Sequence, residues 1–388
     1  MKSNNSWPYD RLRRARRSPK APCLISVIMV LSAMVIFLGA GGVSIAQEPV
    51  IRAALPHVVR DGENGAWLGY GYLCQETSWS QVPKVALRMK NDYRIRYWFL
   101  NVGTLDGTGR LKGSVSTVTN FLNAVKPWEI QQHHQFKILA WLNANADMVD
   151  ITDPAVRSNI VGECTKLVST TAPGSYVAGA SRAFDGMQLD IEPAGEDANH
   201  LAGFVDLFDQ IRASYRSMRM GDKLTSFTPS KWGTRNKWWS SPQFYYTLGG
   251  HVDLLCAMTY DTGITNAAVY QGWMQDQTTN ILKSVSGRYW NNDAQHPAPK
   301  SGVKVMFGLP AFPNNKYHTN IVENISHAAP GVKAGLADLQ AHRDISVRYF
   351  QGAAVYLLTD GSGGDGYSNY LTDWLWFQQY WLDGWKTL

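Results

Sequence analysis

The sequence has few cysteines and no cluster of metal-ligating side chains. Its 388 residues include four cysteines, and the three that follow the N-terminal segment (Cys74, Cys164 and Cys256) lie far apart. An odd number of widely spaced cysteines cannot pair fully into a disulfide framework, and the spacing matches no zinc site. The pair His133-His134 has no partner at ligand spacing. We therefore expect no metal and no cofactor.

The chain also lacks an excess of charge beyond its first 22 residues. Residues 1–22 hold seven Lys and Arg side chains and one acid, Asp10, which accounts for the whole formal charge of +6. The remaining 366 residues carry equal numbers of basic and acidic groups. A neutral body lacks the basic surface with which proteins bind nucleic acid. We therefore expect no nucleic-acid partner.

Charged residues are absent from residues 23–46, which follow the basic segment. A basic stretch, an apolar stretch and then small residues (Ser44-Ile45-Ala46) are typical of a secretory signal peptide. The apolar stretch is also long enough for an uncleaved signal anchor, which would hold the protein in a membrane. In both cases the basic cluster stays in the cytoplasm, and we expect the body to be exported to the periplasm or the extracellular space.

The body, residues 50–388, shows no low-complexity linker, no repeat and no change in composition, so we treat it as one domain. Eight short runs rich in β-branched and aromatic residues recur along it, with helix-compatible segments between most of them. Strands that alternate with helices pair in parallel, and eight such units predict an α/β fold, a closed (β/α)8 TIM barrel. The runs are Trp67–Leu73, Ile95–Val102, Lys137–Leu142, Phe184–Glu192, Lys223–Thr228, Val252–Tyr260, Val303–Leu309 and Gly352–Leu358. The helical segments include Val115–Val125, Ser158–Thr170, Leu201–Met218, Thr278–Ser286 and a closing helix, Leu371–Trp385, whose Trp374, Trp381 and Trp385 we expect in the core.

The fourth run, Phe184–Glu192, differs from the others because it ends in polar residues, and active sites of such barrels lie at the carboxyl ends of the strands. Residues two apart share a face of a strand, so Gln188, Asp190 and Glu192 point together into the barrel. Two acids about 6–7 Å apart along a strand raise each other's proton affinity, and burial raises it further. Glu192, nearer the mouth, is then able to donate a proton. The alternative is a buried polar network that only ties the strands together.

The fourth run resembles the active-site strand of the family 18 glycoside hydrolases, the chitinase family, whose pattern is Asp-Gly-x-Asp-x-Asp-x-Glu. The sequence matches at Asp185, Gly186, Asp190 and Glu192, and has Gln188 at the middle Asp. Other motifs of the family follow in the family's order, across most of residues 65–360. They are Met258-Thr259-Tyr260-Asp261, the Gly-Leu-Pro segment within Phe307–Phe312, and the aromatic stretches Tyr97-Trp98-Phe99 and Gly69-Tyr70.

The resemblance implies substrate-assisted catalysis, an exception to the usual two-carboxylate scheme. Glu192 would protonate the leaving glycosidic oxygen and later activate water, while the N-acetyl carbonyl of the substrate attacks the anomeric carbon. Asp190 would orient the acetamido N–H, Tyr260 would bind the acetamido oxygen, and Asp261 would contact the sugar or the acid. The implied substrate-binding residues are Asp185, Gln188, Met258, Tyr70, Trp98, Trp141, Asn143 and Tyr356, and each aromatic one could equally be a core residue.

Three positions depart from the family pattern. Gln188 replaces a carboxylate, so it cannot share a proton with Asp190. The third run and the residue after it read Ala140-Trp141-Leu142-Asn143 where chitinases usually carry Ser-x-Gly-Gly. Tyr356 stands where they usually have Trp at the floor of the sugar site. These departures indicate a divergent member in which the chemistry is kept and the sugar-binding surroundings are remodelled.

We therefore expect an exported retaining glycoside hydrolase that cleaves β-linked N-acetylhexosamine glycans. Chitin-type oligomers, peptidoglycan and the N-glycan core are the candidate partners, and we expect the chain to act as a monomer. A non-catalytic, lectin-like barrel of the same family is the alternative, although such members typically lose the acid at the position of Glu192. A third interpretation, in which Asp190 and Glu192 bind a metal, lacks a His ligand near any strand end.

Overall fold

The computed structural model describes residues 63–69, 86–112, 117–193, 197–299, 302–312, 316–358 and 371–383. The predicted signal segment 1–46, Tyr70 and Trp385 lie outside these ranges. No helix within them is both long enough and apolar enough to cross a membrane.

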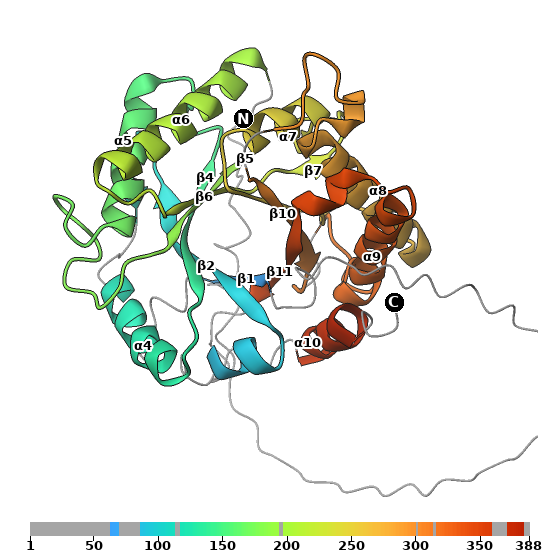
Figure 1. Cartoon of the computed structure of the whole chain (residues 1–388), viewed down its shortest axis with the longest axis horizontal. Helices are drawn as coiled ribbons and strands as arrows, with labels where there is room; N and C mark the ends of the chain where they lie inside the picture. The colour runs from blue at the N-terminus through green and yellow to red at the C-terminus, as the bar shows by residue number, and fades with distance from the viewer. Residues whose placement is uncertain are drawn as a thin grey trace, which may run out of the picture. The chain divides into compact units, whose positions relative to one another are not determined.

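Eight parallel strands form a closed barrel, with β1 paired to both β2 and β11 (Figure 1). Each predicted run overlaps one of these strands, which confirms the (β/α)8 barrel. Around the ring the strands follow the chain order. Their bounds are β1 (Asn64–Leu68), β2 (Ile95–Leu105), β4 (Lys137–Asn145), β5 (Gly186–Glu192), β6 (Leu224–Phe227), β9 (Leu254–Ala257), β10 (Lys304–Pro310) and β11 (Phe350–Leu358).

A ring of helices surrounds the strands (Figure 1). Five of the helices begin at a side chain that accepts a hydrogen bond from a free backbone N–H of the first turn, and these caps are Asp153, Asp197, Ser241, Asn266 and Asn324. Short polar residues at the ends of the loops thus fix where the chain turns into a helix. The helices are α4 (Val118–Gln131), α5 (Pro154–Val168), α6 (Ala198–Ser217), α7 (Pro242–Gly249), α8 (Ala267–Val285), α9 (Ile325–Ala341) and α10 (Leu371–Trp376).

Shorter elements lie between these strands and helices. Strand β3 (Leu111–Lys112) pairs antiparallel with β2, and β7 (Lys231–Trp232) pairs with β8 (Trp239–Ser240). Two 3-10 turns, η3 (Arg288–Trp290) and η4 (Ile345–Tyr349), flank β10 in the chain. The closing segment continues from α10 into a π-helical stretch, η5 (Phe377–Leu382).

Alternate residues of the strands divide between two hydrophobic clusters. The inner cluster fills the barrel and consists of Trp67, Phe99, Leu139, Trp141, Leu254, Cys256, Met306 and Ala354. The outer cluster, between strands and helices, contains Met187, Leu189 and Ile191 of β5. It also contains Trp374 and Trp381, which are 1% and 0% exposed, so their predicted core position is confirmed.

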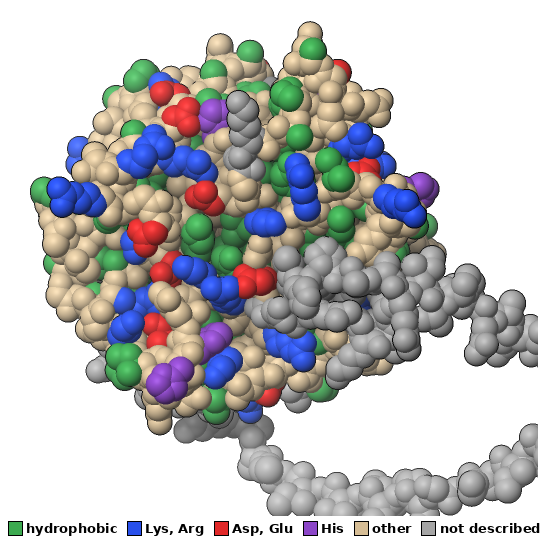
Figure 2. Space-filling model, viewed as in Figure 1, with side chains coloured by type: hydrophobic (Ala, Val, Ile, Leu, Met, Phe, Trp, Pro, Cys, Tyr) green, Lys and Arg blue, Asp and Glu red, His purple; other side chains and the backbone are tan. Residues whose placement is uncertain are grey.

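Charges of both signs are mixed on the surface. On the face shown in Figure 2, Lys and Arg side chains are interspersed with Asp and Glu side chains. Among the described residues, ion pairs join Arg157 to Asp206 and Arg212 to Asp253, both at 2.7 Å. Such partly exposed pairs contribute at most about 1 kcal/mol each, so the fold depends on its apolar clusters.

Gly186, the glycine of the motif, is required by a close approach of two strands. A Cβ atom at this position would lie 2.1 Å from the carbonyl oxygen of Leu224 on β6. The change Gly186→Ala should therefore lower the free energy of unfolding by about 2–3 kcal/mol, measured by urea denaturation. Gly272→Ala is the matched control, since no atom lies within 4 Å of a Cβ there and alanine favours the helix by up to about 1 kcal/mol. Equal stability of Gly186→Ala and wild type would contradict the prediction.

Candidate active site

The polar row of β5 faces the interior of the barrel. Gln188 and Asp190 are buried, and Glu192, the last residue of the strand, is half-buried. Strand β4 places Trp141 opposite Gln188 and Asn143 opposite Asp190. The row thus leads from the barrel core to the carboxyl end of the strand, where the chain leaves the sheet.

Gln188 ties strands together inside the barrel. Its Oε1 accepts a hydrogen bond from Trp67 Nε1 at 2.7 Å, and its Nε2 donates to Ser226 Oγ at 3.1 Å. These contacts join β5 to β1 across the barrel and to β6 beside it. Gln188 is fully buried, so in this arrangement it supports the layer below the acids.

Asp190 is held by two donors from neighbouring strands. Trp141 Nε1 donates to its Oδ2 at 2.9 Å, and Thr228 Oγ1 donates to its Oδ1 at 2.7 Å. Burial raises the pKa of Asp190 to about 6, although the two hydrogen bonds favour the charged form and oppose this shift. Asp190 is thus a carboxylate whose orientation is fixed and whose charge state changes near neutral pH.

Glu192 has a strongly raised proton affinity. Burial is the main reason that its pKa lies well above the usual value, and the negative charges of Asp190 and Asp261 raise the pKa further. Lys231 on β7 acts in the opposite direction and lowers it. A protonated carboxyl group at a strand end of a barrel can serve as a general acid.

Aromatic rings surround the acids. Tyr260, in the loop after β9, stacks on Tyr356 with ring centroids 5.1 Å apart and an interplanar angle of 17°. Phe312 packs edge-on against Tyr260 at 5.5 Å, and Trp141 packs edge-on against Tyr356 at 6.2 Å. Tyr260 is nearly buried at 6% exposure. The rings thus form an apolar wall, and Trp141, which belongs to it, donates a hydrogen bond to Asp190.

Three further predicted residues lie around this wall. Met258 follows β9 and is 8% exposed, and its backbone N–H donates to the carbonyl of Pro229. Asp261 has a left-handed backbone (φ 57°), and its side chain is 34% exposed. The Oδ1 of Asn143 is buried and has no hydrogen-bond partner among the described residues. That oxygen is an acceptor which a hydroxyl or an N–H of a bound sugar could satisfy.

The part of the chain that the structure describes contains no set of side chains that could bind a metal ion. Within it, no group of three His, Cys, Asp or Glu side chains could hold an ion. Cys164 and Cys256 are buried and free, and burial raises the pKa of both thiols far above the usual value. They are therefore small core side chains.

Solved structures share this architecture. The C-terminal domain of a protein assigned as a chitinase, from Desulfitobacterium hafniense DCB-2, matches over 82% of this chain and 98% of that domain, with 15% identity and a TM-score of 0.50. This similarity shows the fold, a (β/α)8 barrel. A chitinase from Bacteroides thetaiotaomicron (15% identity, 82% and 97% covered, TM-score 0.48) and a glycoside hydrolase family 18 N-acetylglucosaminidase from Paenibacillus barengoltzii (12%, 81% and 98%, 0.48) also match. No protein-family model and no curated protein sequence matches the chain.

Trp98 does not face the interior of the barrel, so its predicted sugar-binding role is wrong. It is fully buried in the outer cluster, with its ring 4.2 Å from that of Phe136 and 6.3 Å from that of Phe121 on α4. Side chains alternate along a strand, so only Tyr97 and Phe99 of this aromatic stretch face inward. The two-residue period of the sequence already carries this signal.

Asp185 lies at the opposite end of β5, so its predicted substrate-binding role is also wrong. Asp185 lies seven positions before Glu192, and this separation corresponds to about 23 Å along a strand. Its carboxylate pairs with Arg182 and accepts a hydrogen bond from the backbone N–H of Ile138 at 2.8 Å. Asp185 therefore fixes the start of β5 against β4 and does not reach the mouth.

Some residues at the site lie outside the motifs of the chitinase family. Thr228 binds Asp190, Lys231 acts on Glu192 and Asp261, and His318 lies 4.0 Å from Asp261. Thr228 ends the fifth predicted run and Lys231 follows three residues later, which is a usable signal because barrel sites lie at the carboxyl ends of the strands. His318 lies in the segment between β10 and α9, and no local pattern marks it.

Replacing Asp190 with Asn should stabilise the fold at neutral pH. The pKa of Asp190 is raised from 3.8 to about 6 in the folded state, so above pH 6 the buried charge costs up to about 3 kcal/mol of folding free energy. This cost disappears as the pH falls from 6 towards 3.8, because the folded state then binds the proton more tightly than the unfolded state. Urea denaturation should therefore show a larger gain for Asp190→Asn above pH 6 than near pH 4.

The exposed residue Asp222 supplies the control for this experiment. Asp222→Asn should change the free energy of unfolding by less than about 0.5 kcal/mol at either pH. A gain for Asp190→Asn that is the same at both pH values would show that its carboxylate is not strained by burial. A loss above pH 6 would show that its two hydrogen bonds outweigh the burial cost.

Proposed function

We propose that this chain is a retaining glycoside hydrolase that cleaves β-linked N-acetylhexosamine glycans with Glu192 as its acid and base. The supporting observation is the pair of unlike acids on β5. Burial and the neighbouring negative charges raise the pKa of Glu192, while hydrogen bonds from Trp141 and Thr228 fix the orientation of Asp190. Two carboxyl groups with different proton affinities divide the acid role from the charge-stabilising role.

The proposed reaction proceeds in two steps. Glu192 transfers its proton to the glycosidic oxygen as the bond to the anomeric carbon breaks, and the acetamido oxygen of the substrate forms a new bond to that carbon. Asp190 orients the acetamido N–H and stabilises its positive charge, and the hydroxyl of Tyr260 binds the acetamido oxygen. The Glu192 carboxylate then takes a proton from water, which opens the oxazolinium ring with net retention. Attack within one substrate molecule profits from high effective molarity.

The substrates that we propose are glycans with uncharged 2-acetamido sugars. Apolar rings at the mouth supply stacking faces, and Asn143 supplies an acceptor. We further propose that residues 1–46 direct export, so chitin-type oligomers, peptidoglycan and N-glycan cores are the glycans to compare. A sugar-binding barrel without catalysis would not require a protonated Glu192.

The change Glu192→Gln should abolish hydrolysis and preserve binding. Glutamine keeps the size of the side chain but has no proton to transfer, so kcat should fall by roughly 10²–10⁴-fold. Product release from N-acetylglucosamine oligomers and from peptidoglycan measures the rate, and a thiazoline analogue of the oxazolinium should inhibit the wild type. The matched control is Glu163→Gln on α5, a buried glutamate whose ion pair is with Lys166 on the same helix.

The outcomes separate the candidate functions. Full activity of Glu192→Gln, or no cleavage of any of these glycans by the wild type, would refute the proposed hydrolase. Tight binding of a glycan by a wild type that does not cleave it would favour the lectin-like barrel. Activity that is lost to a chelator and restored by a divalent ion would favour a metal-dependent reaction.

The change Lys231→Met should move the alkaline limb of the pH profile to higher pH. Lys231 lowers the pKa of Glu192, so the pKa rises when that charge is removed, and the acid form then persists to higher pH. The measurement is kcat/KM against pH. Lys237→Met is the matched control, since Lys237 follows in the chain and its exposed side chain pairs with Asp147. A limb that stays in place, or moves to lower pH, would show that Lys231 does not act on the acid.

A further inference from the structure

The loop that carries Tyr260 and Asp261 is held by a buried acid from another loop. Asp261 and Gly263 both have left-handed backbones (φ 57° and 71°), so the chain turns sharply directly after Tyr260. Glu323, which precedes α9, is fully buried and accepts hydrogen bonds from this turn. The donors are Thr262 N at 3.0 Å, Thr262 Oγ1 at 2.8 Å and Gly263 N at 3.1 Å. The position of the turn therefore depends on Glu323.

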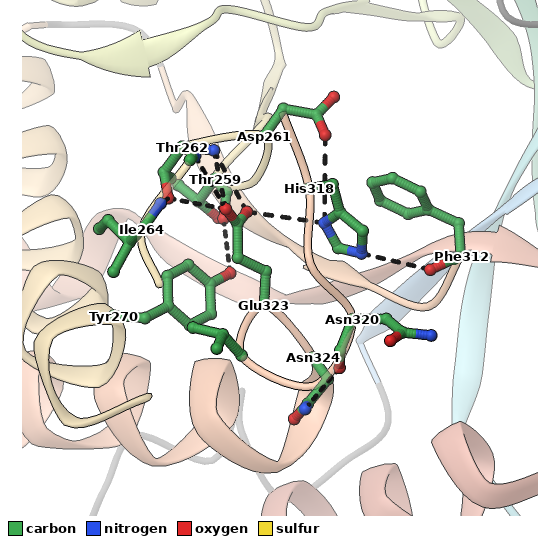
Figure 3. A network of polar contacts seen from close by, with 12 residues as sticks. Thr259, Asp261, Thr262, Ile264, Tyr270, Phe312, His318, Asn320, Glu323 and Asn324 are labelled. Atoms are coloured by element: carbon green, nitrogen blue, oxygen red, sulfur yellow. Dashed lines mark hydrogen bonds and ion pairs between the residues drawn. The ribbon is translucent and has the colours of Figure 1, made fainter. Parts of the chain in front are cut away.

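His318 lies between this buried acid and Asp261 (Figure 3). Its Nδ1 atom is 3.6 Å from Glu323 Oε2 and 4.0 Å from Asp261 Oδ1. Its ring stacks on the ring of Phe312 with centroids 4.0 Å apart, and its Nε2 lies 3.2 Å from the carbonyl oxygen of Phe312. The His318 side chain is fully buried, so packing on one side and two acids on the other fix the orientation of the ring.

These contacts determine where the protons of His318 lie. A carbonyl oxygen only accepts hydrogen bonds, so Nε2 must carry a proton. A neutral ring would then direct the lone pair of Nδ1 at two carboxylates, and Nδ1 is buried without a hydrogen-bond partner among the described residues. A proton on Nδ1 makes both contacts attractive, and it compensates the buried charge of Glu323.

Two other titratable groups act on the same acids. Lys231 on β7 interacts with the charges of Asp261 and Glu323. Burial raises the pKa of the Tyr270 hydroxyl on α8, and the charges of Glu323 and Asp261 raise it further. This hydroxyl donates to the carbonyl of Thr259 at 3.0 Å. Tyr270 thus supports the start of the loop, and His318 is the group that bridges the two carboxylates.

We propose that His318 is a positioning residue whose imidazolium form joins Glu323 to Asp261 and thereby fixes the loop that presents Tyr260 and Asp261. The bridge also places a positive charge beside Asp261, whose negative charge acts on Glu192. The effect on rates rests on the proposed hydrolase function. The protonation state of the ring does not.

The first experiment measures the ring directly in the full-length chain. Histidine labelled with ¹⁵N gives two-dimensional NMR signals for both ring nitrogens, and the signals that vanish in His318→Gln belong to His318. We expect both nitrogens to carry protons at neutral pH. A His318 ring with an unprotonated Nδ1 at that pH would overturn the proposal, whether or not the chain cleaves a glycan.

The second experiment measures the loop and the reaction. In His318→Gln, amide hydrogen exchange of the segment 258–264 should be faster, and kcat should fall roughly 10- to 100-fold with little change in KM, because misplaced groups weaken transition-state binding. Glu323→Gln should act in the same direction. His342→Gln is the matched control, since that side chain is 75% exposed at the end of α9. Unchanged kcat and unchanged exchange in a folded His318→Gln would overturn the proposal.

The two experiments separate the two proposals. A wild type that cleaves none of the glycans, but whose His318 ring carries both protons and whose loop loosens in His318→Gln, would refute the hydrolase and leave the positioning role intact. An active wild type with a neutral His318 ring would do the reverse. A variant His318→Lys, which keeps a cation at the position, should recover part of the kcat lost in His318→Gln.

Discussion

Carboxyl groups that are kept inside a barrel, away from water, are the constraint on which this structure depends. An isolated buried charge costs several kcal/mol or more unless it is paired, hydrogen-bonded or neutralised by a proton. At Asp190, two hydrogen-bond donors offset part of this cost: Trp141 on β4 and Thr228, the residue directly after β6. The layer below is satisfied in the same way, because Gln188 accepts from Trp67 and donates to Ser226. The barrel can therefore close only with these polar partners in register.

The same constraint gives the two acids different properties. Burial raises the pKa of both acids, but two hydrogen-bond donors oppose this shift at Asp190, whereas the negative charges of Asp190 and Asp261 add to it at Glu192. One group is thereby prepared to stabilise positive charge and the other to donate a proton. Nearby Lys231 limits how far the proton affinity of Glu192 rises. The separation of roles thus follows from where the partners stand, although both groups are simple carboxylic acids on one strand.

The sequence predicted what depends on regular periodicity and left open what depends on contacts between loops. The alternation along β5 placed Gln188, Asp190 and Glu192 on one side, and eight strand-like runs predicted the barrel. The same alternation along β2 directs Trp98 outward, although the aromatic motif of that stretch favoured a sugar-binding role for it. His318 and Glu323 contact each other within the segment before α9. Glu323 also accepts a hydrogen bond from Thr262 in the loop after β9. No local pattern encodes such a contact, because it exists only once the barrel has brought the loops together.

Gln188 shows how the chain can depart from the family pattern without losing the arrangement of its acids. A carboxylate at this fully buried position would place a second negative charge next to Asp190, and one of these two groups would have to carry a proton. The amide adds no charge, and it both accepts from Trp67 and donates to Ser226, so the layer remains satisfied. At Asp190, burial raises the pKa and the hydrogen bonds from Thr228 and Trp141 oppose this shift. Substitution at the middle acid therefore changes how Asp190 is tuned, while the position of Asp190 relative to Glu192 remains fixed by the strand itself.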